Sequence, residues 1–416
     1  MIEKIKNKLY NLLRWSEKYT HTDMVYLSKG GFWLTLSQSI SAVSSFLLAI
    51  AFANLLPKEN YGTYKYILSI LPIVALTALP GMNIAITQSI AKGHEGSLVP
   101  AFKNKLKWSS LGSSAALLMA LYYFYQNSST LAIAFLLICI FVPFSESFLL
   151  FSSLLSGKKL FRIASQFSII SQLLLTLSIF ITILLTDSII YIIFVYLFIN
   201  TLLHYIFFKI SKRKYLKNDI KDKEAVSFGK HLSVISIFST IASQIDSILL
   251  WHYLGASSVA IYSFALAPIT PVSTFIKSIF SLAIPKFVNQ DKENLKKSLF
   301  PKVIKSFFLL TIPVLILILI IPPVFHTFFS KYAESIKYAQ LLTITLLFFP
   351  DKLLGMAITS RQNKNLVYKI SLFNASIKII LTLVLLPIYG IWGAIIANIT
   401  QHIIAMLVSV YFFKRM

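Results

Sequence analysis

Apolar residues dominate twelve stretches of about twenty residues each, and short polar segments separate these stretches along the whole chain. The hydrocarbon core of a bilayer takes about 20 apolar residues per helical span. The pattern therefore predicts an all-α polytopic membrane protein with twelve transmembrane helices. The expected spans are residues 30–54, 63–90, 108–126, 130–156, 162–185, 188–208, 230–253, 260–285, 302–325, 336–357, 366–386 and 391–413.

Two of these stretches contain internal prolines. Pro72 and Pro80 lie in the second, and Pro268 and Pro271 lie in the eighth. Membrane helices tolerate proline where neighbouring helices or side chains satisfy the freed carbonyl groups. Both stretches are therefore kept as spans.

The composition agrees with a membrane protein. Hydrophobic residues make up 56% of the chain, and the mean hydropathy is +0.75. A soluble protein of 416 residues could not hide that much apolar surface in one core, so lipid must cover part of it. The net charge of +24 would suggest nucleic acid in a soluble protein, but here the basic residues belong to the loops.

The distribution of basic residues sets the expected orientation. With the N-terminus in the cytoplasm, the cytoplasmic segments hold 33 of the 39 lysines and arginines, including four between the second and third spans. Loops that carry an excess of Lys and Arg stay on the cytoplasmic side. The sequence therefore predicts that both termini are cytoplasmic.

The twelve spans divide into two sets of six. Residues 1–29 form a basic N-terminal segment, residues 30–208 a first lobe, residues 209–229 a basic cytoplasmic linker, and residues 230–416 a second lobe. Tyr64 and its neighbours match Tyr262 and its neighbours at a constant offset. Two six-helix repeats have the same orientation, which predicts a pseudo-two-fold axis along the membrane normal.

The N-terminal segment has a pattern of its own. Apolar residues recur every three to four positions, and lysines occupy the other face. This spacing is typical of an amphipathic helix that lies on the inner leaflet, and the alternative is a frayed basic tail. The apolar positions are Ile2, Ile5, Leu9, Leu12 and Leu13.

Three stretches resemble a known family. They are "GGFWLTLSQSISAVSSFLLAIAFANLLPKENYGTYKY" (30–66), "SQIDSILLWHYLGASSVAIYSFALAP" (243–268) and "LPIYGIWGAIIANITQHI" (386–403). They are similar to the first, seventh and last spans of O-antigen (Wzx-type) polysaccharide flippases. That family is part of the multidrug/oligosaccharidyl-lipid/polysaccharide (MOP) exporter superfamily, which includes the MATE transporters. Asp246 stands at the family's acidic position in the seventh span.

The resemblance implies a function as well as a fold. It implies two lobes that alternate access across the bacterial inner membrane, and export of an undecaprenyl-diphosphate-linked oligosaccharide for O-antigen, capsule or another surface polysaccharide. Its implied partners are this lipid-linked sugar, the bilayer and the polysaccharide polymerase machinery, with no nucleic acid. It implies no cofactor, and the driving force would be a proton or sodium gradient or the membrane potential.

Lysines within the expected spans are the candidate substrate-binding residues. A charge at the bilayer centre costs about 2.5 to 3.5 kcal/mol on insertion scales, so each one needs a reason. Lys277, Lys378 and Lys65 could line a water-filled central cavity and attract a diphosphate, because a lysine holds phosphate as a point charge. The alternatives are snorkelling to a membrane surface, pairing with a carboxylate, or a position among the headgroups.

Acidic and hydroxyl groups within the spans are the candidate coupling or cavity residues. Ser239, Ser243 and Asp246 share one helical face by their spacing, which predicts a polar stripe that faces the lobe interior. Asp246 could carry a coupling proton, neutralise a cavity lysine or anchor hydrogen bonds. Glu146 lies at mid-depth in the fourth span between two serines.

Two other function classes compete with a flippase. A MATE-like small-molecule exporter would favour cavity carboxylates for cationic drugs, and the interior lysines argue against it. A membrane polymerase or glycosyltransferase would need a large external loop or an acidic cluster at one membrane face. The sequence has no phosphate-binding glycine loop, metal-ligand pair or activated nucleophile, so it predicts that the chain is not an enzyme.

Overall fold

The computed structural model describes residues 24–281, 292–360 and 364–415, and these residues fold into helices and short turns without a strand. The first half of the chain runs from α2 to α9. Its elements are α2 (Met24–Leu55), α3 (Lys58–Ala75), η1 (Leu76–Ala78), α4 (Gly81–Ala91), η2 (Glu95–Ser97), α5 (Leu98–Tyr125), α6 (Ser129–Phe148), α7 (Leu150–Gly157), α8 (Phe161–Leu185) and α9 (Ile189–Tyr215).

The second half runs from α10 to α18 over the described residues. Its elements are α10 (Ala225–Leu254), α11 (Ala256–Leu266), α12 (Ile269–Ser281), α14 (Lys292–Phe328), η3 (Ser330–Tyr332), α15 (Ser335–Thr343), η4 (Ile344–Phe348), α16 (Asp351–Ser360), α17 (Lys364–Tyr389) and α18 (Ile391–Arg415). The N-terminal amphipathic helix expected within residues 1–29 falls largely on residues 1–23, which lie outside the described residues.

The helices are long and apolar enough for a polytopic membrane protein. Eight single helices could each cross a bilayer, and three bent pairs raise the number to eleven among the described residues. The remaining long helix is α5, whose 28 residues run beside α6. This count is consistent with the twelve predicted spans.

The three bent spans break next to proline. The bends are 51° between α3–η1 and α4, 45° between α11 and α12, and 43° between α15–η4 and α16. Pro80, Pro268 and Pro350 lie at these breaks, whereas Pro72 lies inside α3 without ending it. Proline removes a backbone donor and clashes with the preceding turn, which explains why the helices bend there.

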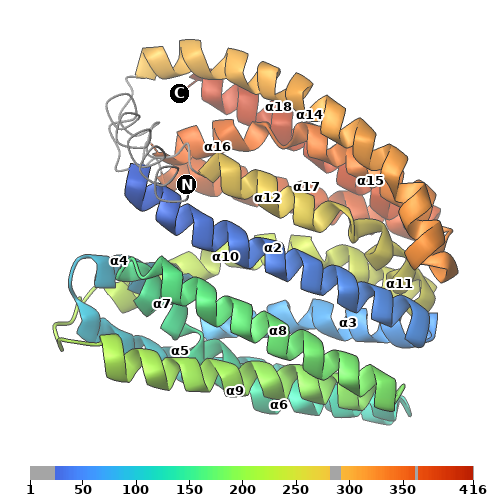
Figure 1. Cartoon of the computed structure of the whole chain (residues 1–416), viewed down its shortest axis with the longest axis horizontal. Coiled ribbons are helices and arrows are strands. Elements are labelled where there is room, and N and C mark those ends of the chain that lie inside the picture. The colour runs from blue at the N-terminus through green and yellow to red at the C-terminus, as the bar shows by residue number, and fades with distance from the viewer. Residues whose placement is uncertain (1–23, 282–291, 361–363, 416) are drawn as a thin grey trace, which may run out of the picture.

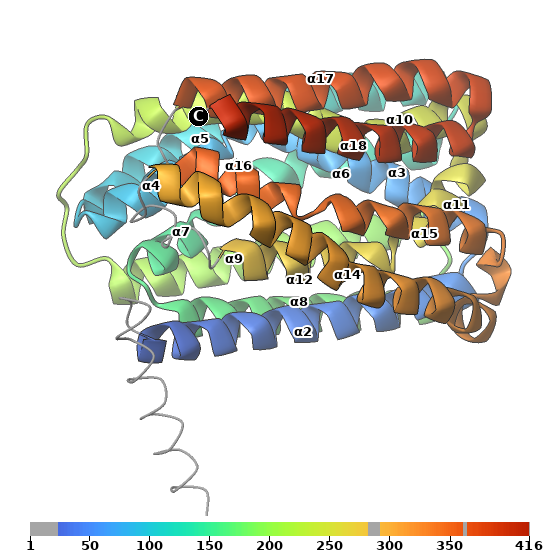
Figure 2. The ribbon, with the colours of Figure 1, turned by 90° about the horizontal axis from the view of Figure 1, so that it is seen from above.

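The helices lie roughly parallel in one elongated bundle, as Figures 1 and 2 show from two directions. Within the first half, α2 packs on α8 and α6 packs on α9; within the second half, α17 packs on α18. The halves meet where α3 and α4 pack against α10 and α11. We call the end where α2 passes into α3 the α2–α3 end, and the opposite end, where α4 passes into α5, the α4–α5 end.

Two glycines allow the halves to approach closely. A Cβ on Gly62 of α3 would lie 1.8 Å from the carbonyl oxygen of Ala256 at the start of α11. A Cβ on Gly81 of α4 would lie 2.4 Å from the backbone nitrogen of Ser233 in α10. The Gly81 N–H also donates to the Ser233 hydroxyl, at 3.0 Å. The contact between the halves therefore requires glycine both at Gly62 and at Gly81.

The linker between the halves is shorter than predicted and is attached to the first half. The predicted linker of residues 209–229 shrinks to residues 216–224, because α9 continues to Tyr215 and α10 begins at Ala225. Gly96 donates to the carbonyl of Ile220 at 2.9 Å, and the Asp222 N–H donates to the Ser97 hydroxyl at 2.8 Å.

Glu95 is the central residue of this attachment. Its carboxylate lies 2.6 Å from Lys158 Nζ and accepts the backbone N–H of Lys217. Burial raises the pKa of the Glu95 carboxyl, but the Lys158 ion pair and the backbone donors outweigh burial and hold the pKa below its ordinary value of 4.5. The ionised carboxylate of Glu95 therefore attaches the linker to the first half.

Candidate functional site

A buried ion pair lies in the second half between α10 and α17. Lys378 Nζ is 2.8 Å from Asp246 Oδ2, and each side chain is 9% exposed. Thr382, one turn beyond Lys378, donates to Asp246 Oδ1 at 3.1 Å. Of the arrangements that the sequence left open for Asp246, the structure shows both the pairing with a lysine and hydrogen bonds from neighbouring helices.

Two further polar residues complete the surroundings of Asp246. Tyr262 of α11 donates its hydroxyl to Asp246 Oδ2 at 2.8 Å. Asn398 of α18 lies 3.5 Å from the same tyrosine oxygen. Four helices of the second half thus contribute to one network, and both oxygens of the carboxylate are satisfied. The positive charge of Lys378 is consequently neutralised in this state.

The serine stripe predicted on α10 does not join the network. Ser239 and Ser243 are exposed, and their hydroxyls donate back to the carbonyls of Ser236 and Thr240 at 3.0 and 2.8 Å. Ser243 therefore does not pack beside Asp246 among the described residues, and its place in a cavity between the lobes stays a prediction. The spacing places the three residues on one helical face, but of the three only Asp246 is buried.

A second buried polar group lies in the first half, and the sequence pattern indicated only one of its two charges. Lys105 of α5 is fully buried, with Nζ 3.8 Å from Glu146 Oε2 of α6 and 3.2 Å from Asn83 Oδ1 of α4. Lys105 is one of the four basic residues assigned to the loop after the second span, and that assignment is wrong. The Glu146 side chain is 22% exposed, so this carboxylate is less deeply buried than Lys105.

Lys65 differs from the other lysines within the spans. It lies two turns into α3 from the α2–α3 end and is partly exposed. Its Nζ lies 5.4 Å from the ring centre of Tyr61, within the range of a cation–π contact. No carboxylate pairs with Lys65 among the described residues, so its charge is not neutralised as that of Lys378 is.

Aromatic side chains from both halves close the α2–α3 end next to Lys65. The Tyr61 ring is 4.7 Å from that of Phe264 in α11, and the Phe264 ring is 3.9 Å from that of Tyr332 in η3. All three side chains are buried. We call Tyr61, Phe264 and Tyr332 the aromatic seal.

Polar contacts between the halves surround the aromatic seal. Lys58 pairs with Glu334, and the Ser257 hydroxyl donates to Glu59 at 2.7 Å. Lys331 donates to the carbonyl of Asn54 at 2.8 Å. Because each contact joins the first half to the second, separating the halves at this end would break all of them together.

Two further charged residues lie in the second half, and the sequence singled out only the first of them. Lys277 lies in α12, and its side chain is outside the described residues. Asp351 was not singled out in the sequence. It begins α16 at the break after Pro350, is 3% exposed, and leaves Oδ1 without a partner while Lys352 lies 3.2 Å from Oδ2. A carboxylate directly after a proline inside an apolar stretch was the signal that could have found it.

Comparison with known proteins identifies the family. A sequence model described as "polysaccharide biosynthesis protein" matches residues 27–289, more than half of the chain. The chain belongs to this polysaccharide biosynthesis protein family. An uncharacterized membrane protein of Methanocaldococcus jannaschii is 23% identical over 93% of this chain and 84% of its own length.

Solved structures share the fold of this family member. The lipid II flippase MurJ in an inward closed conformation superposes with a TM-score of 0.70 at 17% identity, over 92% of this chain and 87% of that one. An inward-facing MATE family transporter of the MOP superfamily gives 0.65 at 13%, over 91% and 94%. A MOP superfamily transporter from Pyrococcus furiosus gives 0.61 at 16%, over 93% and 96%. The protein is thus a multi-pass membrane protein with the fold of MOP transporters, and the named structures with this fold are transporters rather than enzymes.

Proposed function

We propose that this protein is a flippase that moves a polyprenyl-diphosphate-linked oligosaccharide across the bacterial inner membrane by alternating access. The product would feed the synthesis of O-antigen, capsule or another surface polysaccharide, and a polysaccharide polymerase would take it over on the outer side. Both termini would be cytoplasmic, so the α2–α3 end would face outward. The two lobes would be residues 30–208 and 230–416.

The unneutralised charge of Lys65 carries this proposal. Lys65 lies one turn inward of Tyr61 on α3, and this four-residue step places it on the same helical face as that member of the aromatic seal. A diphosphate headgroup that enters between the lobes would supply the anion that the described part of the chain does not. Lys277 of α12 would add a second positive charge for the same diphosphate, while Lys378 would contribute its charge only if Asp246 released it.

The seal supports the alternating-access part of the proposal. The Tyr61–Phe264 contact of the seal and the polar contacts around the seal join the two halves, so the structure is closed at the α2–α3 end. A rocking motion of one lobe against the other would break these contacts and open that end. The sugar and diphosphate would pass between the lobes, and the polyprenyl chain would stay in the lipid.

An ion gradient is the proposed driving force. Asp246 and Glu146 are the carboxylates placed to take part, since each already pairs with one lysine within its own half. A proton or sodium ion that competed with the lysine for the carboxylate would free a positive charge for the substrate. This gives each half one site where ion binding and substrate binding are coupled.

A MATE-like small-molecule exporter is the second candidate, and the MATE superpositions favour it. Exporters of cationic drugs need unpaired carboxylates facing the cavity. In the described residues, Asp246 and Glu146 are both paired with lysine, which favours an anionic cargo. The two candidates therefore differ in the sign of the charge that they bind.

Expression of this protein in a flippase-deficient bacterial strain, with surface polymer as the readout, tests the proposal. We expect wild type to restore the surface polymer, Lys65→Ala to abolish restoration, and Lys65→Arg to retain part of it. Lys337→Ala, an exposed lysine in α15, is the matched control and should export normally. Membrane levels of each variant should be equal. Full export by Lys65→Ala would remove Lys65 from the site, and drug resistance without polymer export would favour the exporter.

A further inference from the structure

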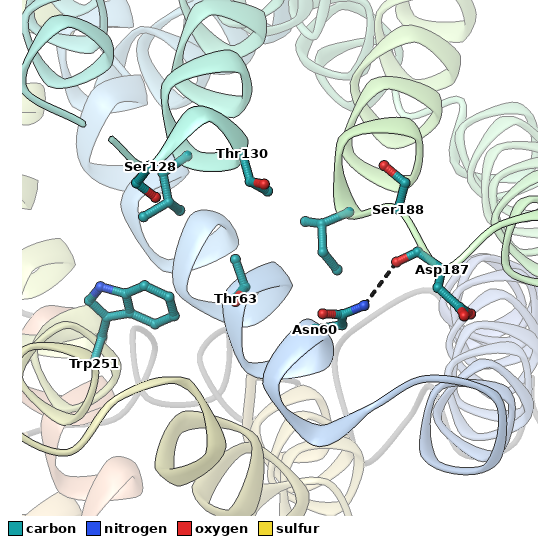
Figure 3. Close-up of a pocket in the computed structure, with 9 residues that line it drawn as sticks. Asn60, Thr63, Ser128, Thr130, Asp187, Ser188 and Trp251 are labelled. Carbon is teal, nitrogen blue, oxygen red and sulfur yellow. Dashed lines mark hydrogen bonds between the residues drawn. The ribbon is translucent and has the colours of Figure 1, made fainter. Parts of the chain in front are cut away.

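A pocket of about 300 Å³ opens at the α2–α3 end, away from the aromatic seal. Figure 3 shows its lining, which is mainly polar with one indole ring. The lining residues are Asn60, Thr63, Ser128, Thr130, Leu131, Asp187, Ser188, Ile189 and Trp251. Ligand sites in proteins begin at about this volume, so the pocket suits a small ligand or the end of a larger one.

Four separate segments build this pocket. Asn60 and Thr63 come from the first turns of α3, Ser128 and Thr130 from the start of α6, and Asp187 and Ser188 from the α8–α9 turn. Trp251 comes from the last turn of α10 and is the only contribution of the second half. In the proposed orientation all of these segments reach the outer membrane surface.

Several polar groups in the pocket have no partner among the described residues. The hydroxyls of Ser128, Thr130 and Ser188 and the carboxylate of Asp187 make no side-chain hydrogen bond there. Asn60 uses its Nδ2 on the backbone carbonyl of Asp187, at 3.0 Å, which leaves its Oδ1 available. The pocket therefore offers a ring of donors and acceptors that are mostly neutral.

Trp251 is held in place by tyrosines behind the pocket. Its ring stacks on Tyr66 of α3 with 4.4 Å between centres and 11° between planes. Tyr66 and Tyr123 share a hydrogen bond of 2.7 Å between their hydroxyls, and Tyr123 also interacts with the indole of Trp251. The part of the indole that lines the pocket is thus a fixed apolar surface beside polar groups.

We propose that this pocket binds saccharide at the outer surface, as a docking site for sugar residues of the exported glycan; this inference rests on the proposed function. A pyranose ring presents an apolar C–H face and a rim of hydroxyls. Trp251 matches the face, and the hydroxyls, the Asn60 amide and the Asp187 carboxylate match the rim. A cationic lipid headgroup would instead need several carboxylates or an aromatic cage, and the pocket has a single carboxylate and a single aromatic ring.

Fluorescence of Trp251 tests the binding directly. The full-length chain with Trp15→Phe, Trp33→Phe, Trp108→Phe and Trp392→Phe keeps Trp251 as its only tryptophan. The probe is the oligosaccharide pool released by mild acid from the lipid-linked intermediates of the producing cells, added to the protein in nanodiscs. We expect a saturable change in Trp251 emission that Asp187→Asn and Thr130→Val each weaken at least tenfold.

A matched control variant and two control ligands show whether the response is specific to the pocket and to sugar. Thr327→Val, an exposed threonine of α14 outside the pocket, should bind like the parent protein. No saturable change, or an equal response in Asp187→Asn and Thr130→Val, would overturn the inference. A response to ethanolamine or choline in place of the oligosaccharide would also overturn it, in favour of a lipid headgroup.

The fluorescence test is independent of the complementation test of transport. Normal polymer export together with no oligosaccharide binding would remove the pocket and leave the flippase intact. Failure of export in the complementation experiment, with retained binding in nanodiscs, would remove the transport role and leave a saccharide site.

Discussion

Lys378 of α17 and Asp246 of α10 form an ion pair of 2.8 Å inside the second half, nearly sealed from solvent. Removing one partner of such a pair leaves an uncompensated buried charge, which costs about 3–5 kcal/mol, whereas replacing both by apolar residues is often neutral. We expect Lys378→Met to lower the thermal unfolding temperature in detergent strongly, and Lys378→Met with Asp246→Leu to recover most of the loss.

The double variant also separates stability from transport. If the pair takes part in coupling, the recovered double variant should still fail to export. Equal stability of the single and double variants would contradict the buried-pair argument. Normal export by a stable double variant would make the pair structural.

The ion pair between Lys58 and Glu334 should bias the protein toward closure at the α2–α3 end. Exposed pairs contribute only about 0–1 kcal/mol, so the expected effect is a shift in population rather than unfolding. The reporter of closure is a cysteine introduced by Leu68→Cys in a Cys139→Ala background. Position 68 lies on the same face of α3 as Tyr61, two turns further inward. Lys58→Glu should speed the reaction of this reporter cysteine with an impermeant maleimide, and Lys58→Glu with Glu334→Lys should restore slow labelling.

Gly62 should be intolerant of any side chain. A Cβ there would lie 1.8 Å from the carbonyl oxygen of Ala256, so Gly62→Ala must move α3 away from α11. We expect the same Leu68→Cys labelling to become fast, with reduced thermal stability. Gly31→Ala is the control, because a Cβ on Gly31 meets nothing within 4 Å. Slow labelling in Gly62→Ala would show that the helices can absorb the methyl group.

Acid should release the linker from the first half. Because the folded pKa of Glu95 lies below its ordinary value of 4.5, its contribution is complete above that value and is lost as the pH falls through the lower, folded pKa. Hydrogen exchange of residues 216–224, corrected for intrinsic rates, should therefore lose protection only below about pH 4.5.

A substitution should reproduce the acid effect at neutral pH. Glu95→Gln removes the charge that Lys158 and the Lys217 N–H contact, at a cost of about 1–3 kcal/mol. The exposed Glu224→Gln should leave the protection of the linker unchanged. Unchanged protection in Glu95→Gln would assign the attachment to the backbone bonds of Gly96 and Asp222 instead.

The helical class was readable from the sequence because hydropathy acts locally. The prolines marked two of the three bent spans, but the sequence predicted no bend in them, and the bend at Pro350 was not foreseen. The partners of the charged residues were not readable, because they depend on how distant helices pack. Lys105 sits at the edge of an apolar stretch and looks like a loop residue, but Glu146 and Asn83 from two other helices bury it. Ser243 is exposed whereas Asp246, three residues further on, is buried, because helical spacing gives a shared face but not how far neighbouring helices cover it.

The hydrogen bond between Glu59 and Ser257 joins positions separated by 198 residues, the same separation as that between Tyr64 and Tyr262. Segments that the sequence predicts to be equivalent therefore touch each other where α3 meets α11. Their charged residues do not repeat: Ser263 corresponds to Lys65, and Leu48 corresponds to Asp246. Along this offset, the first half keeps a lysine that no described carboxylate pairs with, whereas the second half cancels the charge of its buried lysine internally, so substitutions at offset-related positions should not have equivalent effects.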